Sequence, residues 1–268
     1  MQFADLTLAR RLERAGAQSG VEYAQAQARL HSELGATVEA VAGGHAIFVG
    51  PASPLSRAVG LGLSGPVTTA ELDRAETFYR ERGTPVQVEL CPLAHPSLRE
   101  SLGRRGYRLA EFENVWVRPL DRRGSFPPPS PEIRITEAGL EQADVWADTV
   151  SRGFAEQEDL TPADLEIAAP FPHMASVSCF LAWIGGRPAG AAALGIHQRL
   201  AALFTASTRV SFRGRGVQTA LLHARLAFAA ARGCDLAAVQ TEPGSASQRN
   251  VERLGFRLAY TKVTMIRE

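Results

Sequence analysis

The feature that most constrains this chain is an internal repeat, because its two halves carry matching residues in the same order. Residues 106–110 read Gly-Tyr-Arg-Leu-Ala, and residues 255–259 read Gly-Phe-Arg-Leu-Ala. The same register carries Arg118 onto Arg267 without a gap. With a shift of one residue further upstream, four more positions correspond: Val67, Thr69, Ala70 and Leu72 with Val217, Thr219, Ala220 and Leu222. The pattern favours two copies of one α/β domain over two unrelated domains.

The boundary between the copies is predicted at residues 122–131. This stretch contains Phe-Pro-Pro-Pro-Ser-Pro at 126–131, and proline fixes φ and removes backbone donors, so it favours neither helix nor central strand. We therefore expect a first domain over 1–121, a proline-rich linker over 122–131 and a second domain over 132–268. The chain has 268 residues, 45% of them hydrophobic, which is enough for two ordinary domains.

Hydrophobic periodicity and turn residues predict the same run of elements in both copies. In the first copy we expect helices over 5–34 with a break near 16–20, strands over 37–42, 46–49 and 58–63, a helix over 68–82, a strand over 85–90, a helix over 95–102 and a pair of strands over 107–117. In the second copy we expect a strand over 133–135, helices over 137–152 and 161–168, strands over 177–184, 188–196 and 200–208, a helix over 217–232, a strand over 236–241, a helix over 245–254 and strands over 256–267.

One short stretch, residues 213–218, predicts an anion site. Gly214 and Gly216 let the backbone approach a ligand closely, and the first N–H groups of the following helix have no partner within it. A phosphate-binding P-loop would need Gly-Lys-Ser/Thr at the helix entrance, and a dinucleotide fingerprint would need a third glycine in place of Thr219; neither is present. Taken alone, the stretch is as typical of a glycine-rich turn that caps a helix.

The remaining pattern, R-x-x-G-x-G/A, resembles the acyl-coenzyme A loop of the GCN5-related N-acetyltransferases (GNAT), with Gln218 in the last position. The resemblance extends over 133–267 as an element order, and includes the segments 208–210 and 243–256. It implies an α/β fold of the α+β kind with a mixed sheet, which splays open between its fourth and fifth strands. With the repeat, the expectation becomes two tandem acyl-CoA N-acyltransferase-like domains.

The resemblance also implies a set of cofactor-binding residues for the co-substrate acetyl-coenzyme A. Backbone groups of Thr208 and Val210 would contact the pantetheine arm, and Asn250 would hydrogen-bond that arm or serve as a surface or capping residue. The pyrophosphate would lie on the loop formed by Arg213, Gly214, Arg215, Gly216, Val217, Gln218 and Thr219.

The first copy is expected to have lost this phosphate site and to have a structural role. In the register of the repeat, residues 63–66 stand where 213–216 stand in the second copy. Pro66 then replaces Gly216 and has no N–H, so it cannot contribute to a cradle made of backbone donors.

The chemistry implied is attack of an amine on a thioester, which needs a base for the amine, donors for the oxyanion and an acid for the thiolate. A backbone N–H near Thr208 would serve the oxyanion. The family often has a tyrosine as the acid four residues before its Gly-Phe pair, and here that position is Val251. Glu242, just past the fifth strand, is the candidate catalytic base, although a carboxylate in a surface turn is the simpler interpretation. Tyr260 is a further hydroxyl that we expect to pack in the core.

The proposed activity is N-acetyl transfer from acetyl-CoA to a primary amine of a small molecule or peptide. The alternatives are a non-catalytic acyl-CoA-binding regulatory module and a tandem scaffold without a ligand. Acidic residues at 156, 158 and 159 would suit a cationic acceptor, or are simply solvated. A monomer or a homodimer is equally compatible with a tandem chain.

Composition excludes several other classes of function. The formal net charge is only +1, which argues against nucleic acid as a partner. The three cysteines stand singly, without C-x-x-C or a nearby histidine pair, so we expect reduced core thiols and no metal site. No apolar run approaches the ~20 residues of a membrane span, and the start has no signal-peptide pattern, so the expected location is cytoplasmic.

Overall fold

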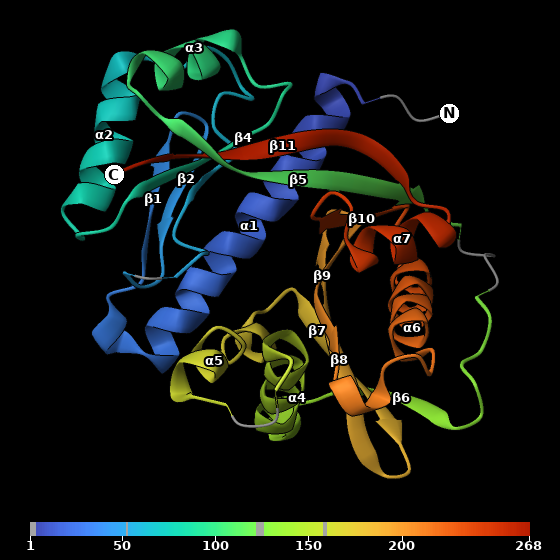
Figure 1. Ribbon diagram of the computed structural model, residues 1–268. Coiled ribbons are helices and arrows are strands. Elements are labelled where there is room, and N and C mark those ends of the chain that lie inside the picture. The colour runs from blue at the N-terminus through green and yellow to red at the C-terminus, as the bar shows by residue number, and fades with distance from the viewer. Residues whose placement is uncertain (1–3, 52, 122–125, 158–159) are drawn as a thin grey trace. The chain divides into compact units, whose positions relative to one another are not determined.

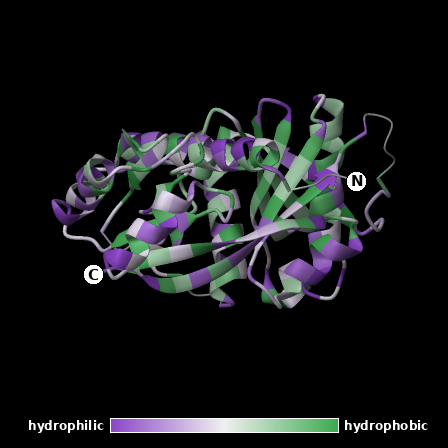
Figure 2. Cartoon of the chain, turned by 90° about the horizontal axis from the view of Figure 1, so that it is seen from above, coloured by the Kyte–Doolittle hydropathy of each residue, from purple (hydrophilic) through white to green (hydrophobic). Residues whose placement is uncertain are grey.

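The computed structural model describes residues 4–51, 53–121, 126–157 and 160–268. These residues form two compact units, each with its own helices and strands (Figure 1). The first unit contains the chain up to Val117 together with Gln240–Glu268, and the second contains Arg118–Val239. Green and purple segments alternate along the helices and along the long strands in Figure 2, as expected of elements that turn one apolar face to a core. The protein has a mixed α/β fold.

The first unit is a mixed sheet in the strand order β1-β2-β3-β4-β11-β5. Only β3 and β4 run parallel, and every other neighbouring pair in this unit is antiparallel. Its elements are α1 (Leu6–Leu30), β1 (Thr37–Val41), β2 (Gly44–Phe48), β3 (Ala58–Val59), α2 (Thr69–Arg80), β4 (Val86–Leu90), α3 (Pro96–Arg104), β5 (Arg108–Pro119), α7 (Ala246–Arg253) and β11 (Arg257–Arg267).

The second unit is a sheet in the order β10-β9-β8-β7-β6, with α4 against one face and α6 against the other (Figure 1). Strands β6 to β9 form an antiparallel meander, and β10 pairs parallel with β9. Its elements are β6 (Ile133–Ala138), α4 (Ala143–Ala155), α5 (Pro162–Glu166), β7 (Val177–Ile184), β8 (Arg187–His197), β9 (Leu200–Thr208), α6 (Val217–Ala231) and β10 (Leu236–Thr241). The last two residues of β10 are counted with the first unit.

The C-terminal strand β11 lies between β4 and β5 of the first unit (Figure 1). It pairs antiparallel with β5, from Arg257 opposite Val117 to Ile266 opposite Arg108. These two strands are the matching ends of the sequence repeat, so a local pseudo-two-fold axis relates them. Glu113 and Lys262 are equivalent in the repeat register and are also directly paired across the strands, which places the axis between them.

The compact units therefore do not follow the expected borders. The second unit starts at Arg118, close to the expected linker at 122–131, of which 122–125 lie outside the described residues. The stretch 240–268, expected to complete the second domain, instead packs with the first unit because β11 fills the position between β4 and β5. That each repeat is a domain of its own, with the first one decayed, stays a prediction.

Three details of the predicted elements were wrong. Helix α1 runs unbroken through Gly16 and Gly20. A Cβ at Gly20 would lie 2.5 Å from Ile47 Cδ1, so this glycine allows the helix to pack closely on β2 and does not end it. Only Ala58–Val59 of the expected strand over 58–63 is a strand. The stretches 107–117 and 256–267 each form one long strand instead of a pair, and their pairing is interrupted only by two irregularities, one at Ala259 and one at Ala110.

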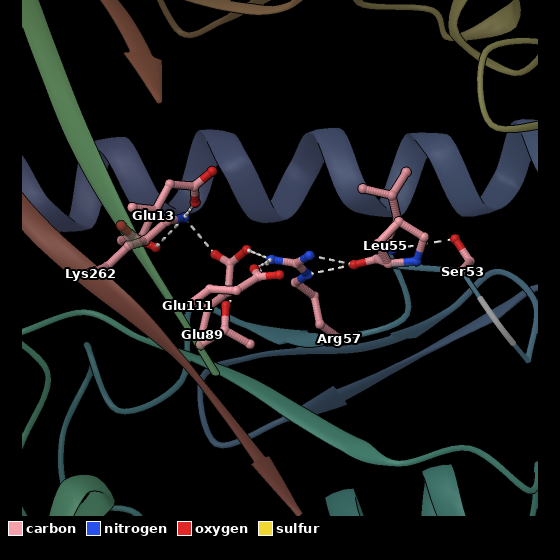
Figure 3. A network of polar contacts seen from close by, with 10 residues as sticks. Glu13, Ser53, Leu55, Arg57, Glu89, Glu111 and Lys262 are labelled. Carbon is pink, nitrogen blue, oxygen red and sulfur yellow. Dashed lines mark hydrogen bonds and ion pairs between the residues drawn. The ribbon is translucent and has the colours of Figure 1, made fainter. Parts of the chain in front are cut away.

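A buried ionic cluster fixes β11 within the first unit (Figure 3). Lys262, whose side chain is only 4% exposed, places its Nζ 2.5 Å from a Glu89 carboxylate oxygen and 3.6 Å from one of Glu113. Arg57 lies 3.2 Å from the other oxygen of Glu89, and Glu13 is 4.0 Å from Lys262. Burial would raise the pKa of Glu89, but the Lys262 and Arg57 charges outweigh it and lower that pKa. Burial raises the pKa of Glu113, and Glu89 adds to the rise.

These opposite shifts predict opposite effects of two matched substitutions. The lowered pKa of Glu89 means that its charge stabilises the fold above the ordinary glutamate pKa and is lost as the pH falls. The raised pKa of Glu113 means that its charge opposes folding as the pH rises. We expect Glu89→Gln to lower the free energy of unfolding by about 3 kcal/mol at pH 7.5, and Glu113→Gln to leave it unchanged or raise it, in denaturant titrations. A larger loss in Glu113→Gln than in Glu89→Gln would contradict this assignment of charges.

Candidate functional site

The candidate site in the second unit starts at a strand edge without a partner. Strands β9 and β10 are paired only from Leu200 and Leu236 to Leu203 and Val239. Strand β9 continues to Thr208, so its residues 204–208 have a pairing neighbour on the β8 side only, within the described chain. An unpaired strand edge presents backbone N–H and C=O groups to a ligand. The splaying after the fourth strand of the meander matches the expectation from sequence.

A β-bulge shapes this edge. The register between β8 and β9 shifts between Ala191 opposite Ser207 and Ala193 opposite Phe204, so two residues of β9, Thr205 and Ala206, face one residue of β8. Thr205 has a φ of +45°, which is rare for a β-branched residue. Sequence reasoning missed this bulge, because no glycine marks it.

The amides beyond the bulge point alternately to the two sides of β9. Arg209 donates its N–H to Ala189 O at 3.0 Å, on the β8 side. Because successive amides of an extended chain alternate in direction, the N–H groups of Thr208 and Val210 face the unpaired edge. The hydroxyl Oγ1 of Thr208 is buried, and no hydrogen-bond partner for it occurs among the described residues. Both predicted pantetheine contacts thus lie on the open side of the strand.

The glycine-rich loop presents a run of donors next to that edge. Gly214 and Gly216 have φ values of +74° and +82°, and Gly216 is the N-cap of α6. Ala220 is the first residue of this helix whose N–H finds a backbone acceptor, Gly216 O at 3.0 Å. The six amides of residues 214–219 donate to no other group of the described chain, so they form an exposed N-terminal anion cradle that includes Val217, Gln218 and Thr219.

The two arginines of the loop are held by neighbouring side chains and carbonyls. Arg213 lies 2.9 Å from a Glu156 carboxylate oxygen at the C-terminal end of α4, and also donates to Gly153 O at 3.1 Å and Thr208 O at 3.3 Å. Arg215 pairs with Glu132. Both guanidinium groups are thereby partly neutralised. The backbone amides are therefore expected to contribute more to the attraction of an anion than the two arginine side chains. Glu156 belongs to the predicted acidic loop, whose residues 158 and 159 lie outside the described residues.

Close backbone packing holds the end of β9 from both faces. A Cβ at Gly153 of α4 would lie 2.2 Å from Ser207 Oγ, and one at Gly190 of β8 would lie 2.7 Å from Ser207 O and 2.8 Å from a methyl group of Val217. Ser207 Oγ donates to Val150 O at 2.7 Å. Glycine at these two positions therefore lets α4 and α6 approach the strand that carries the site.

Helix α6 also sends a buried arginine to the bulge. Arg225 donates from Nη1 to Ala193 O at 3.0 Å and to Phe204 O at 3.4 Å, and from Nε to Leu221 O at 3.2 Å. Sequence reasoning missed this residue. A signal was present, because Arg225 follows Leu221 by four residues and so stands on the apolar stripe of a helix.

The corresponding helix of the first copy, α2, has a side-chain cap at its N-terminus. The N-cap Thr68 accepts from the amide of Glu71, and the Glu71 carboxylate accepts from the amide and hydroxyl of Thr68, both at 2.8 Å. These hydrogen bonds lower the pKa of Glu71. The helix end that follows Pro66 thus carries a carboxylate of the chain in its first turn.

The remaining predicted residues belong to the first unit. Glu242 is exposed in the turn before α7, where its carbonyl accepts from Ser245 Oγ at 2.8 Å. Asn250 lies on α7 and is half-buried, and Val251 beside it is buried. Tyr260 donates its hydroxyl to Glu13 at 2.7 Å, and burial with the Glu13 charge raises the pKa of this hydroxyl. Tyr260 is therefore committed to the core, as expected.

The comparisons with known proteins agree with this geometry. Residues 144–256 match the family model described as "Acetyltransferase (GNAT) family". The chain carries a GNAT acetyltransferase domain. Members of this family are acyl-CoA-dependent N-acyltransferases that use acetyl-CoA as co-substrate, and the chain is an enzyme of this type. No curated protein matches the chain.

Solved GNAT structures share the fold over most of the chain. A GCN5-related N-acetyltransferase from Kribbella flavida is 20% identical with a TM-score of 0.61, covering 92% of this chain and 95% of that one. A tandem GNAT protein from the clavulanic acid biosynthesis pathway is 14% identical with a TM-score of 0.62, covering 84% and 78%. A GCN5-related N-acetyltransferase from Sphaerobacter thermophilus is 18% identical with a TM-score of 0.57, covering 75% and 67%.

The residues present fit acetyl-CoA. The amides of 214–219 suit a pyrophosphate, and the open edge of β9 with the buried hydroxyl of Thr208 suits the amides of a pantetheine arm. Within the described residues, no group of three or more His, Cys, Asp and Glu side chains could hold a metal ion. The three cysteines are buried, and none of them forms a disulfide within the described residues. No helix of the described chain has the length and apolar character needed to cross a bilayer.

The loop geometry predicts a selective loss of cofactor affinity in Gly214→Ala. Gly214 and Gly186 have nearly the same φ, +74° and +76°, and a Cβ at either would meet nothing within 4 Å. The strain introduced by alanine is therefore matched, but only Gly214 lies in the cradle. We expect Gly214→Ala to raise the Kd for acetyl-CoA at least about 10-fold by calorimetry, and Gly186→Ala to leave it within about 2-fold. Equal effects of the two substitutions would argue against a phosphate at this loop.

Proposed function

We propose that this GNAT enzyme transfers the acetyl group of acetyl-CoA to a primary amine of a small molecule or peptide. The observation that carries the proposal is the joint arrangement of six partnerless amides at residues 214–219 and the unpaired edge of β9. Thr208 and Val210 would hold the pantetheine arm, and Asn250 would add a hydrogen bond to it. This arrangement fits a donor with a pyrophosphate at one end and a thioester at the other.

The reaction requires the amine nitrogen to attack the thioester carbonyl carbon, after which the C–S bond breaks. A backbone N–H on the unpaired edge of β9, near the bulge, would bind the oxyanion. The amine loses one proton to a base, and the thiolate takes one up. Val251 is buried and apolar where relatives often have a tyrosine, so we infer that water or another group supplies the proton to the thiolate.

Glu242 is the proposed base, acting directly or through one water molecule. Its side chain is exposed in a turn, and no hydrogen bond or ion pair of its carboxylate occurs among the described residues, unlike those of Glu71 and Glu89. We expect Glu242→Gln to lower kcat/KM about 100-fold while the Kd for acetyl-CoA stays unchanged. Glu252→Gln, at an exposed site on α7, is the matched control and should retain full activity. A Glu242→Gln enzyme as active as the control would remove this residue from the mechanism.

The activity itself is tested by thiol release from acetyl-CoA across a panel of amines. Amino sugars, polyamines, amino acids and peptide N-termini would cover the acceptor classes, with each acetylated product identified by mass. Release that depends on one class of amine supports the proposal. Binding of acetyl-CoA without release for any amine would instead support the regulatory module.

The first copy is proposed to bind no acyl-CoA, since Glu71 and Pro66 occupy the position of the cradle. Calorimetry is therefore expected to give one acetyl-CoA per chain, and the Gly214→Ala substitution should weaken that single site. Two sites per chain, one of them insensitive to Gly214→Ala, would show that the first copy kept its ligand.

A further inference from the structure

Arg225 is a buried charge without a carboxylate partner. It lies on α6 and is only 1% exposed. No Asp or Glu of the described residues forms an ion pair with it, and its hydrogen bonds go to three backbone carbonyls, those of Leu221, Ala193 and Phe204. Burial lowers the pKa of Arg225 to about 9, so the group stays charged at neutral pH.

A charge in this position is unfavourable for stability alone. Removing a guanidinium from water without a counter-ion is expensive, and an apolar side chain of similar size would suit the apolar stripe of α6 better. Ala193 and Phe204 are register partners across β8 and β9 at the base of the bulge, and Arg225 donates to the carbonyl oxygens of both. The guanidinium therefore fixes the positions of these two carbonyls at the bulge, which an apolar side chain could not do.

The direction of the Phe204 carbonyl fixes the direction of the next amide. Phe204 is the register partner of Ala193, and its oxygen shares the guanidinium with Ala193 O, so it points to the β8 side. The described chain has no cis peptide bond, and in a trans peptide the C=O and N–H point in opposite directions. The N–H of Thr205 therefore points to the other side of β9, where β10 has diverged.

We propose that Arg225 is a positioning residue for acyl transfer, which holds the bulge of β9 and strengthens the Thr205 amide as a donor to the thioester carbonyl oxygen. This inference rests on the proposed function. It assigns a role to a side chain that lies on the far side of the strand from the open edge and does not contact the substrate itself.

Two physical effects support the role. A peptide group whose oxygen accepts a hydrogen bond from a cation donates more strongly through its N–H, because hydrogen bonds in a chain polarise one another. In addition, Thr205 has a left-handed φ of +45°, and strained residues persist only where their surroundings over-determine them. Arg225 fixes the carbonyl directly before this strained residue, which keeps the amide aimed before any ligand binds.

The test replaces the guanidinium and follows binding and turnover separately. Arg225→Met keeps the length and apolar packing of the side chain but removes the charge and the donors. We expect the Kd for acetyl-CoA to stay within about 3-fold of the wild type, because the amides of 214–219 are untouched, and kcat to fall about 10- to 100-fold. Arg232→Met, an exposed residue at the end of the same helix, is the matched control and should change neither.

A vibrational spectrum separates this role from a merely structural one. Acetyl-CoA labelled with ¹³C at the thioester carbonyl should show a downward shift of its C=O stretch when bound to the wild type without an amine. We expect a smaller shift in Arg225→Met, an intermediate one in Arg225→Lys and the full shift in Arg232→Met. If Arg225→Met does not fold, the shift and kcat of Arg225→Lys decide instead.

The possible failures are distinct. A wild-type protein that binds no acetyl-CoA refutes the proposed function. A wild type that binds and acetylates, with the same kcat and C=O frequency in every folded Arg225 variant, refutes only the role of Arg225. A lowered melting temperature in Arg225→Met with kcat and C=O frequency unchanged in the folded fraction assigns the arginine to stability alone and also overturns the proposal.

Discussion

The one constraint on which the second unit depends is the early end of the β9–β10 pairing. Beyond Leu203 the strand β9 keeps its pairing with β8, but no strand of the described residues pairs with its other edge. Unpaired backbone groups inside a fold are unfavourable unless a ligand or water satisfies them, so the topology leaves donors and acceptors along this edge that a ligand could use. The end of the β9–β10 pairing leaves several groups available to a ligand. They are the amides at the start of α6, the hydroxyl of Thr208 and the amide of Thr205.

The first unit depends on a different constraint, the insertion of β11 between β4 and β5. The repeat brings residues 113 and 262 opposite each other at a local pseudo-two-fold axis. In two identical copies the same residue would face itself there, and a like-charged pair would be unfavourable. Within one duplicated chain the two positions can differ, and here they are glutamate and lysine. The Glu113–Lys262 contact thus favours pairing of the first copy with the second copy over pairing of two identical copies.

Sequence reasoning recovered most of the element order and the glycine-rich turn before α6, since these depend on glycines, turn residues and local periodicity, whereas the splayed sheet was implied by the resemblance to the GNAT family. It could not place β11, because residues 106–110 and 255–259 are nearly alike and a strand pattern does not state which sheet receives the strand. The bulge at Thr205 was missed because its geometry comes from tertiary contacts, namely Arg225 on one side and α4 on the other. Glu13, Glu89 and Lys262 are far apart in sequence, so only the fold reveals their cluster.

The two copies also show how one helix position leads to two outcomes. The first amides of a helix need acceptors, which come either from the chain or from a ligand. In the first copy Thr68 and Glu71 form a capping box and supply a carboxylate. In the second copy the N-cap of α6 is Gly216 and its third helical residue is Thr219, and neither supplies a side-chain capping bond within the described residues, so the amides remain available. Because a carboxylate and a phosphate both accept hydrogen bonds from the start of a helix, we propose that Glu71 in the first turn of α2 disfavours a pyrophosphate there, whereas Thr219 in the first turn of α6 leaves the amides to one.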